Sequence, residues 1–464
     1  MSAPLATARP SRPRLPPFLS DLRLAWLLTR GSDRREWWRV GLTAVGAALA
    51  TGIGLAVVAL LSLDGFYSVS FGSGLFDSPG DRRNVGLALV LLLIPVLGFL
   101  GQCARIGAVH RDRRLAALRL AGATPGQVRR IAALESGLAC LAGATVATAA
   151  VVPLLLPYAV AWTGVVLVAA AVPVLGAVVS AVALRRVVAD PLGRVRRVRP
   201  VRGPGRLFAT AARLLAAATV VIALTPIFGS PVFFDLGPVA VLVVAVLVSL
   251  IAIWLSGASS RQLGEGFAAG TSRPALLIAA ERMREDPWST ARTHAALLLV
   301  TVVGSGFAGV RQILLADLAQ GRRENSLGAD MAYYTTGIDL TAAAILVAFA
   351  LVLTALAVGT AESLATRRRG LAAQAAAGVP HAVLARALLL ETALPLFPAI
   401  AVAGLGGTTI SLWYGASVSE YVDVPLPYTA LLVPVGVYAA CLLAAATSLP
   451  LLRRSVRPGE LRYA

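Results

Sequence analysis

Long uncharged runs alternate with short arginine-rich stretches along the whole chain. A helix needs about 20 apolar residues to cross the roughly 30 Å hydrocarbon core of a bilayer. Ten stretches approach that length, and each predicts a transmembrane helix. The predicted spans are 40–61, 85–103, 131–154, 165–184, 207–227, 239–255, 294–310, 340–360, 388–412 and 428–452. The pattern therefore predicts an all-α, polytopic integral membrane protein with about 10 transmembrane helices.

Composition agrees with this pattern. Of the 464 residues 57% are apolar and only 14% are charged, and the mean hydropathy is +0.78. These values exclude an ordinary soluble globular chain. The three cysteines, Cys103, Cys140 and Cys441, lie far apart in or beside apolar runs, so we interpret them as small core residues and predict no metal site.

The basic residues are unusual because all 42 of them are arginines, which give the chain a net charge of +19. A phosphate-binding loop of the G-x-x-x-x-G-K-[ST] type needs a lysine to reach the phosphates of ATP. The absence of lysine therefore excludes such a loop, and any ATP-driven work needs a second polypeptide. Lysine-free, alanine-rich usage is typical of a bacterial genome rich in G and C.

The arginine distribution predicts the orientation of the spans. If residues 1–39 form an uncleaved cytoplasmic lead-in, 37 of the 42 arginines fall on the cytoplasmic side. The five on the outside are Arg82, Arg83, Arg311, Arg322 and Arg323. We therefore expect a multi-pass protein of the bacterial cytoplasmic membrane with both termini cytoplasmic. The basic linkers predict contact with membrane lipids, and no nucleic acid is expected as a partner.

One cytoplasmic segment occurs twice. Residues 113–135 read RRLAALRLAGATPGQVRRIAALE, and residues 369–391 read RGLAAQAAAGVPHAVLARALLLE. The charged and glycine positions that keep a spacing of 256 residues are Arg113 and Arg369, Gly122 and Gly378, Arg130 and Arg386, and Glu135 and Glu391. The flanks also resemble each other, because LAWLLTRGSDRREWWR at 24–39 precedes the first span and LIAAERMREDPWSTAR at 277–292 precedes the seventh. We interpret this as an internal repeat of one orientation.

The repeat predicts a 4+2+4 arrangement of spans. In chain order we expect a cytoplasmic lead-in with an amphipathic elbow helix (1–39), a first four-span unit (40–184), a basic cytoplasmic linker (185–206), a two-span insert (207–255), a cytoplasmic linker with a second elbow helix (256–293), a second four-span unit (294–452) and a basic cytoplasmic tail (453–464).

The first repeated segment predicts a short helix outside the membrane. Leu115 and Leu118 share one helical face, whereas Arg114 and Arg119 lie largely elsewhere. Gly122 permits a helix to end, and the following Thr-Pro pair favours the start of the next one. If a partner protein binds this helix, the helix can transmit force to the spans; if none binds it, it is a helix that lies at the membrane interface.

This pattern resembles the permease domain of the FtsX/MacB/LolC group, the type VII ABC transporters, and the ten-span layout is similar to BceB-type permeases. The resemblance implies that each repeated segment is a coupling helix that docks on a separate ABC-type ATPase, with two ATPase copies per permease chain. ATP and Mg would be bound by that partner, and no cofactor by this chain. The implied coupling residues are Arg113, Arg114, Leu115, Leu118, Arg119 and Gly122 in the first copy and Arg369, Leu371 and Gly378 in the second.

The second copy departs from the pattern, because Val-Pro-His at 379–381 replaces Ala-Thr-Pro at 123–125. This difference implies asymmetric coupling. Glu135 and Glu391 fall about one turn inside the spans that follow the two segments. We expect each carboxylate to brace its coupling segment against the span, and a direct transport role is the alternative.

The predicted external loops, 62–84 and 311–338, hold about 23 and 28 residues and are too short for a domain with its own core. The first either dips into the outer leaflet or covers a lateral opening, or it is a floppy connector. No catalytic motif is present, since His110, His294 and His381 lie far apart and no nucleophile motif occurs, so we expect a non-catalytic subunit.

The spans hold few polar groups, which favours a hydrophobic or amphipathic cargo such as a lipid-like molecule, an antibiotic or a peptide. The sequence therefore predicts the permease subunit of an ABC exporter. One alternative is an FtsX-like signalling protein that regulates a cell-envelope partner. A second is an ion-driven secondary transporter, which would have opposed repeats and membrane-embedded acids.

Overall fold

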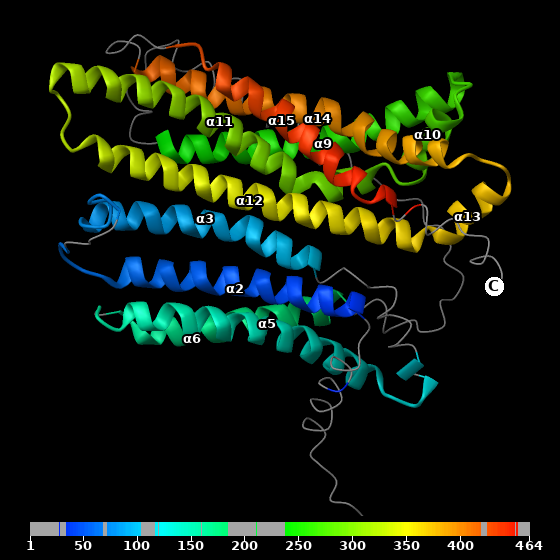
Figure 1. The fold of residues 1–464 in the computed structure, drawn as a ribbon, viewed down its shortest axis with the longest axis horizontal. Helices are drawn as coiled ribbons and strands as arrows, with labels where there is room; N and C mark the ends of the chain where they lie inside the picture. The colour runs from blue at the N-terminus through cyan, green and yellow to red at the C-terminus, as the bar shows by residue number, and fades with distance from the viewer. Residues whose placement is uncertain are drawn as a thin grey trace, which may run out of the picture. The chain divides into compact units, whose positions relative to one another are not determined.

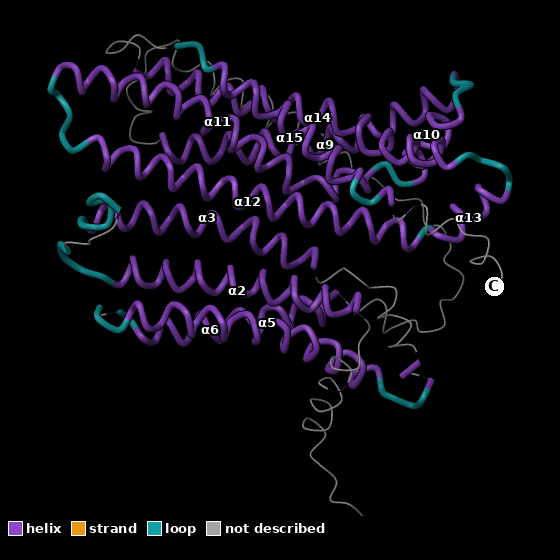
Figure 2. Tube along the Cα trace, in the orientation of Figure 1, coloured by secondary structure: helices purple, strands orange, loops and turns teal. Residues whose placement is uncertain are grey.

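A computed structural model describes residues 34–67, 72–103, 117–118, 120–158, 160–183, 237–418 and 425–450, together with residues 27, 210 and 452. Every regular element in this part of the chain is a helix (Figure 2). The helices are α2 (Arg34–Ser62), α3 (Pro79–Cys103), α5 (Pro125–Leu155), α6 (Trp162–Ala183), α9 (Gly237–Gly270), α10 (Pro274–Glu285), α11 (Trp288–Glu324), α12 (Met331–Thr366), α13 (Arg368–Ala376), α14 (His381–Val418) and α15 (Tyr428–Ala446).

The described residues confirm the all-helical fold, and their long apolar helices are consistent with a multi-pass membrane protein. Among the described residues eight helices, α2, α5, α6, α9, α11, α12, α14 and α15, are long and apolar enough to cross a membrane. Helix α3 carries the second predicted span but is not among the eight. The fifth predicted span, 207–227, falls outside the described residues except for Thr210. The total of ten spans therefore stays a prediction.

The contacts divide the chain into two compact units, and the first is built from α5, α6 and α2 as far as Val58. Its helices approach closely at glycines. A side chain at Gly143 of α5 would collide with the backbone of α2 at Ala44, and one at Gly54 of α2 would press on Val168 of α6. Small residues at such crossings let apolar helices pack without a gap, as in many membrane proteins.

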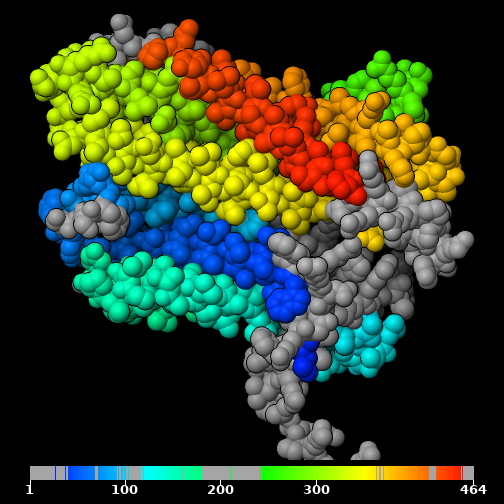
Figure 3. All heavy atoms as spheres, in the orientation of Figure 1, coloured from blue at the N-terminus to red at the C-terminus, as the bar shows by residue number. Residues whose placement is uncertain are grey.

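The second unit contains the end of α2 from Ala59, the loop that follows it, α3, and α9 through α15 (Figure 1). Helices α9, α11 and α14 pack against one another around its core. In the most apolar windows of α9 and α11, 56% of the residues are buried, against 22% in α12 and α15. Helices α12 and α15 lie side by side on one face of this unit (Figure 3).

Helices α11 and α14 cross at glycines and serines. A Cβ atom added to Gly407 of α14 would lie 2.5 Å from the carbonyl oxygen of Val302 and 2.6 Å from the Cβ of Ser305. Gly306 of α11 meets the same stretch of α14, through the carbonyl of Gly407. Any larger residue at Gly407 must therefore push the two helices apart.

Helix α9 is much longer than the span predicted from its hydropathy. The predicted span ends at residue 255 because Ser256 and Gly257 begin a more polar stretch, but the helix continues to Gly270. Residues 271–273 alone join it to α10. The boundary that we expected between a two-span insert and a cytoplasmic linker thus falls inside a helix that packs against α10, α11 and α14.

Most of the predicted external segment 311–338 between α11 and α12 is helical. Only residues 325–330 separate the two helices, so both helices extend into the segment that the sequence predicts to lie outside the membrane. The polar residues of the last turns of α11 lowered its hydropathy without ending the helix. It ends at Asn325, which adopts a left-handed conformation with φ of 51° and donates its N–H to the carbonyl of Gly321.

Many hydroxyl side chains inside the long helices bond to their own backbone. Ser249 of α9 donates to the carbonyl of Ala245 at 2.6 Å, and Thr301 of α11 donates to that of Leu297 at 2.8 Å. Ser259 lies within hydrogen-bond distance of two acceptors, the carbonyl of Ser256 in its own helix at 3.2 Å and that of Pro395 in α14 at 3.3 Å. These bonds satisfy hydroxyls that have no water to bind.

Candidate functional site

The short helix α13 occupies the second repeated segment and ends in a glycine turn. Gly378 has φ of +90°, a conformation that suits glycine because it has no Cβ. The N–H of Ala377 donates to the carbonyl of Ala373 at 3.0 Å, and that of Val379 donates to the carbonyl of Gln374 at 3.1 Å. The bond from Val379 spans five residues, as in a Schellman motif, and it satisfies a carbonyl at the end of the helix.

The first repeated segment ends in the same turn. Gly122 has φ of +97°. Here the N–H of Ala121 donates to the carbonyl of Ala117 at 2.9 Å, and that of Ala123 donates to the carbonyl of Leu118 at 3.0 Å. Each donor and each acceptor lies 256 residues before its counterpart in the second segment. The register found in the sequence thus recurs in the backbone hydrogen bonds.

The helices that follow the two turns also begin in this register, since α5 begins at Pro125 and α14 at His381. They are capped differently. Thr124 and Gln127 form a capping box at α5, with bonds of 3.0 and 3.3 Å. Pro380 replaces Thr124 before α14 and has no side-chain acceptor to offer. The second turn therefore lacks the cap that fixes the first one.

A small apolar core holds α13 in place. Leu371 is 2% exposed and belongs to a buried cluster with Leu364 of α12 and Leu384 of α14, against which Ile278 of α10 packs. The first turn has a related core, in which Leu118 packs against Val128 and Ala132 of α5. Val128 and Leu384 occupy equivalent positions in the repeat. The N-terminal turns of α5 and α14 thus support the two segments in a similar way.

The residues that the structure describes as exposed in α13 and its turn are all small. They are Gly370, Ala373, Ala376, Ala377 and Gly378. In the first segment the exposed residues include Leu120, whose exposed fraction is 79%. The two copies therefore share a turn but present different surfaces.

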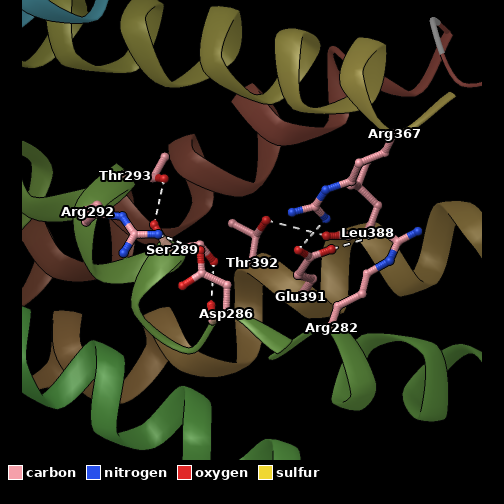
Figure 4. A network of polar contacts seen from close by, with 9 residues as sticks. All are labelled: Arg282, Asp286, Ser289, Arg292, Thr293, Arg367, Leu388, Glu391 and Thr392. Atoms are coloured by element: carbon pink, nitrogen blue, oxygen red, sulfur yellow. Dashed lines mark hydrogen bonds and ion pairs between the residues drawn. The ribbon is translucent and has the colours of Figure 1, made fainter. Parts of the chain in front are cut away.

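An ion-paired carboxylate joins three helices next to α13 (Figure 4). Glu391 of α14 accepts a hydrogen bond from Arg367 Nη1 at 2.8 Å and another from Arg282 Nη1 at 3.2 Å. Arg367 is the residue between α12 and α13, and Arg282 belongs to α10. The Glu391 and Arg282 side chains are each 16% exposed, and that of Arg367 is 40% exposed. Glu391 thus ties the start of α13 and the elbow helix α10 to one turn of α14.

The turn from α10 into α11 is fixed by a second ion pair (Figure 4). Arg292 Nη2 donates to Asp286 Oδ2 at 2.5 Å, and the hydroxyl of Ser289 donates to the backbone carbonyl of Asp286 at 2.8 Å. Pro287 separates the two helices, because a proline fits the first residues of a new helix but not the end of the old one. The predicted elbow segment 277–292 is therefore two helices joined by a short, bonded turn.

The structure places only part of the predicted site. Of the first coupling segment, Arg113, Arg114, Leu115 and Arg119 lie outside the described residues, whereas Leu118 and Gly122 form the core and the turn described above. Glu135 is 2% exposed in α5 and takes part in a polar or electrostatic contact. Arg369 lies in the first turn of α13, and Leu371 and Gly378 lie as described.

Two residues of the Glu391 cluster escaped the sequence reasoning. Arg282 and Arg367 counted only as charges that set the orientation of the spans. Arg367 begins a run of three arginines, and its place 24 residues before Glu391 carries no signal by itself. Arg282 lies 109 residues away from Glu391. A contact between segments so far apart depends on the packing of α10 against α14.

Searches against protein-family models, curated proteins and solved structures found no match to this chain. The resemblance to FtsX/MacB/LolC permeases therefore stays a prediction from the sequence.

Proposed function

We propose that this chain is the permease subunit of an ABC transporter, driven by ATP hydrolysis on separate ATPase subunits. One observation carries the proposal. The two repeated segments end in the same glycine turn, 256 residues apart, and each turn leads directly into a long apolar helix. Two identical ATPase subunits need two equivalent docking elements on the permease, and the two repeated segments would supply them.

The surroundings of α13 suit it to transmit force. Its buried face is anchored through Leu371, and its start is anchored through the Arg367–Glu391 pair. Its described exposed residues are alanines and glycines, which let the backbone of a partner approach closely. A displacement of α13 would therefore reach α10, α12 and α14 together instead of being lost in a flexible linker.

The proposal assigns ATP and Mg to the partner ATPase and none to this chain. The arginine distribution favours a cytoplasmic position for both segments, with ten spans in a 4+2+4 arrangement and an ATPase copy under each segment. The differing caps and exposed residues of the two copies support asymmetric coupling. The apolar exterior of the described helices supports export or extraction of a hydrophobic or amphipathic compound.

The short connection of α11 to α12 bears on the signalling alternative. An FtsX-like regulator of an envelope partner needs an external surface large enough to bind that partner. Residues 325–330 offer no such domain between these two helices. We therefore place export ahead of signalling.

The proposal is tested by crosslinking in native membranes. A photo-crosslinking amino acid at Ala376 should capture a polypeptide with a G-x-x-x-x-G-K-[ST] loop, identified by mass spectrometry. The control is the same amino acid at Ala332, an exposed alanine in the first turn of α12, at the other end of that helix from α13. Capture at Ala376 but not at Ala332 supports the proposal. Equal capture at both, or capture of no ATPase, would overturn it.

A second experiment tests the need for this contact. Ala376→Glu places a charge on the exposed face of α13 and leaves Leu371 and Glu391 in place. It should abolish copurification of the ATPase, whereas Ala332→Glu should leave copurification unchanged. An ATPase that stays bound to the Ala376→Glu variant would show that α13 is not its docking element.

A further inference from the structure

Residues 63–67 and 72–78, which we call the latch segment, form an ordered structure around one buried arginine at the start of α3. Arg82 is 1% exposed. Its Nη1 donates to the carbonyls of Phe76 at 2.8 Å and Asp77 at 3.0 Å, and its Nη2 donates to that of Leu63 at 3.1 Å and to that of Gly65. Four backbone carbonyls from both arms of the segment thus converge on one guanidinium group.

Two more contacts close the latch segment. The ring of Tyr67 lies 5.3 Å from the centre of the Arg82 guanidinium, within the range of a cation–π interaction. The N–H of Tyr67 donates to the carbonyl of Asp77 at 3.2 Å and joins the two arms directly. The hydroxyl of Ser78 and the carboxylate of Asp81 are bonded at 2.8 Å at the start of α3. The latch segment is therefore fixed to α3 and is not a plain connector.

The tip of the second arm has an unusual backbone. Gly72, Ser73 and Gly74 follow one another with φ of +87°, +52° and +85°. Glycine tolerates this region, but a serine there is uncommon and carries a conformational cost. The hydroxyl of Thr336 in α12 donates to the Ser73 hydroxyl at 3.2 Å. The strained residue thus shares a hydrogen bond with α12.

One face of α12 receives the latch segment. Tyr333, Thr336 and Gly337 are three and four residues apart, so they lie on the same side of the helix. The Leu75 side chain reaches within 3.7 Å of where a Cβ of Gly337 would stand, and the Tyr333 ring lies beside Gly74. Leu75 therefore lies in van der Waals range of this face of α12.

Helix α12 connects this contact to α13. It runs without interruption from Met331 to Thr366, and Arg367 follows. At 1.5 Å per residue its 36 residues span about 54 Å. The latch segment holds one end, and the Arg367–Glu391 pair holds the other. Between these two ends, α12 packs on the core of the second unit through Ala348, Val352 and Leu356, so a displacement at one end can pass along an intact helix to the other.

We propose that the latch segment acts as a gate on the extracellular side. It holds α3 to α12 in the resting protein, and it separates from α12 when α13 is displaced. The release of the latch segment rests on the proposed function, because the ATPase must move α13. The contact between the latch segment and α12 in the resting protein does not depend on the proposed function. Parting of Ser73 from Thr336 would open the outer side between α3 and α12 to cargo. The geometry thus assigns a gating role to a segment in which the sequence shows only a short loop.

Paired cysteines test the latch. In a chain whose Cys103, Cys140 and Cys441 are replaced by alanine, the Ser73→Cys, Thr336→Cys pair should form a disulfide rapidly under mild oxidation. The control pair is Ser73→Cys, Thr335→Cys, because Thr335 is one residue away and turned to another face of α12. We expect disulfide formation at least about tenfold slower in the control, whose sulfurs point apart. Equal rates in the two pairs would overturn the docked state.

The Ser73→Cys, Thr336→Cys pair also reports movement. In native membrane vesicles, ATP trapped with vanadate should reduce the rate of disulfide formation between the two introduced thiols severalfold relative to vesicles without nucleotide. A rate that ATP leaves unchanged, in vesicles where the crosslinker at position 376 captures the ATPase, would overturn the latch while the proposed function stands. If position 376 captures no ATPase, the proposed function fails, the latch loses its drive, and the control comparison alone decides whether the two segments dock.

Discussion

The carboxylate of Glu391 gives a direct test of how α13 is held. It accepts hydrogen bonds from Arg282 at 3.2 Å and from Arg367 at 2.8 Å, and its side chain is 16% exposed. A hydrogen bond to a charged group contributes about 1.5–3 kcal/mol when it is shielded from water. The contribution of Arg367, which is 40% exposed, is lower because water screens its charge.

These values predict the effect of Glu391→Gln. The amide keeps one oxygen acceptor for one arginine, but it has no negative charge and cannot accept from both arginines equally well. We expect the free energy of opening of α13 to fall by about 2 kcal/mol. Since 1.36 kcal/mol corresponds to a factor of ten, α13 should open roughly 30-fold more often.

Amide hydrogen exchange measures this opening, because exchange of a protected amide reports the population of its open state. In detergent or nanodiscs, amides within 368–376 should exchange roughly 30-fold faster in the variant. The matched control is Glu281→Gln, which removes an exposed pair with Arg284 on α10 and should change exchange in α13 very little. Unchanged exchange in Glu391→Gln, or an equal change in both variants, would refute the reasoning.

Three further predictions use matched pairs and thermal unfolding or proteolysis. Gly378→Ala should cost about 1 kcal/mol, because alanine disfavours φ of +90°, whereas Gly370→Ala inside α13 should be neutral or stabilising; a lower unfolding temperature in both would contradict this. Arg82→Lys should make the latch segment sensitive to protease, because an ammonium group cannot reach four carbonyls as the guanidinium does, and the exposed Arg83→Lys should not; equal cleavage would argue against the buried network. Gly407→Val should lower the unfolding temperature strongly by separating α11 from α14, while Gly436→Val on an open face of α15 should change it little.

The sequence predicts the helical architecture well because the thickness of the bilayer core sets both the length of an apolar run and the length of the helix that it forms. The nine predicted spans that lie in the described part of the chain fall on helices. The ends are less predictable, since a helix continues past its apolar core until a residue ends it. Helix α11 includes Arg311 and runs on to Asn325, and α9 runs from its apolar part to Gly270. Asn325 and the glycine are recognisable stop signals, but hydropathy alone gives them no weight.

The candidate site also has a part that local sequence predicts and a part that it does not. The turns at Gly122 and Gly378 follow from local sequence, because a glycine after an amphipathic stretch ends a helix in a known manner. The partners of Glu391 depend on how α10, α12 and α14 pack, and a single sequence does not encode that distance in any local pattern. The four carbonyls around Arg82 are also not predictable from the sequence, because every residue has a backbone carbonyl and its residue type does not show which carbonyls bind the arginine.

The hydroxyl bonds within the long helices bear on how the chain is assembled in the membrane. A serine that bonds to its own helix can enter lipid alone, before any neighbour exists. Ser259 has the carbonyl of Ser256 within reach from the start, but its second acceptor, that of Pro395, is synthesised 136 residues later. At ribosomal speeds this delay is roughly 7–27 s. Helix α9 can therefore wait in the bilayer with this hydroxyl satisfied until α14 arrives beside it.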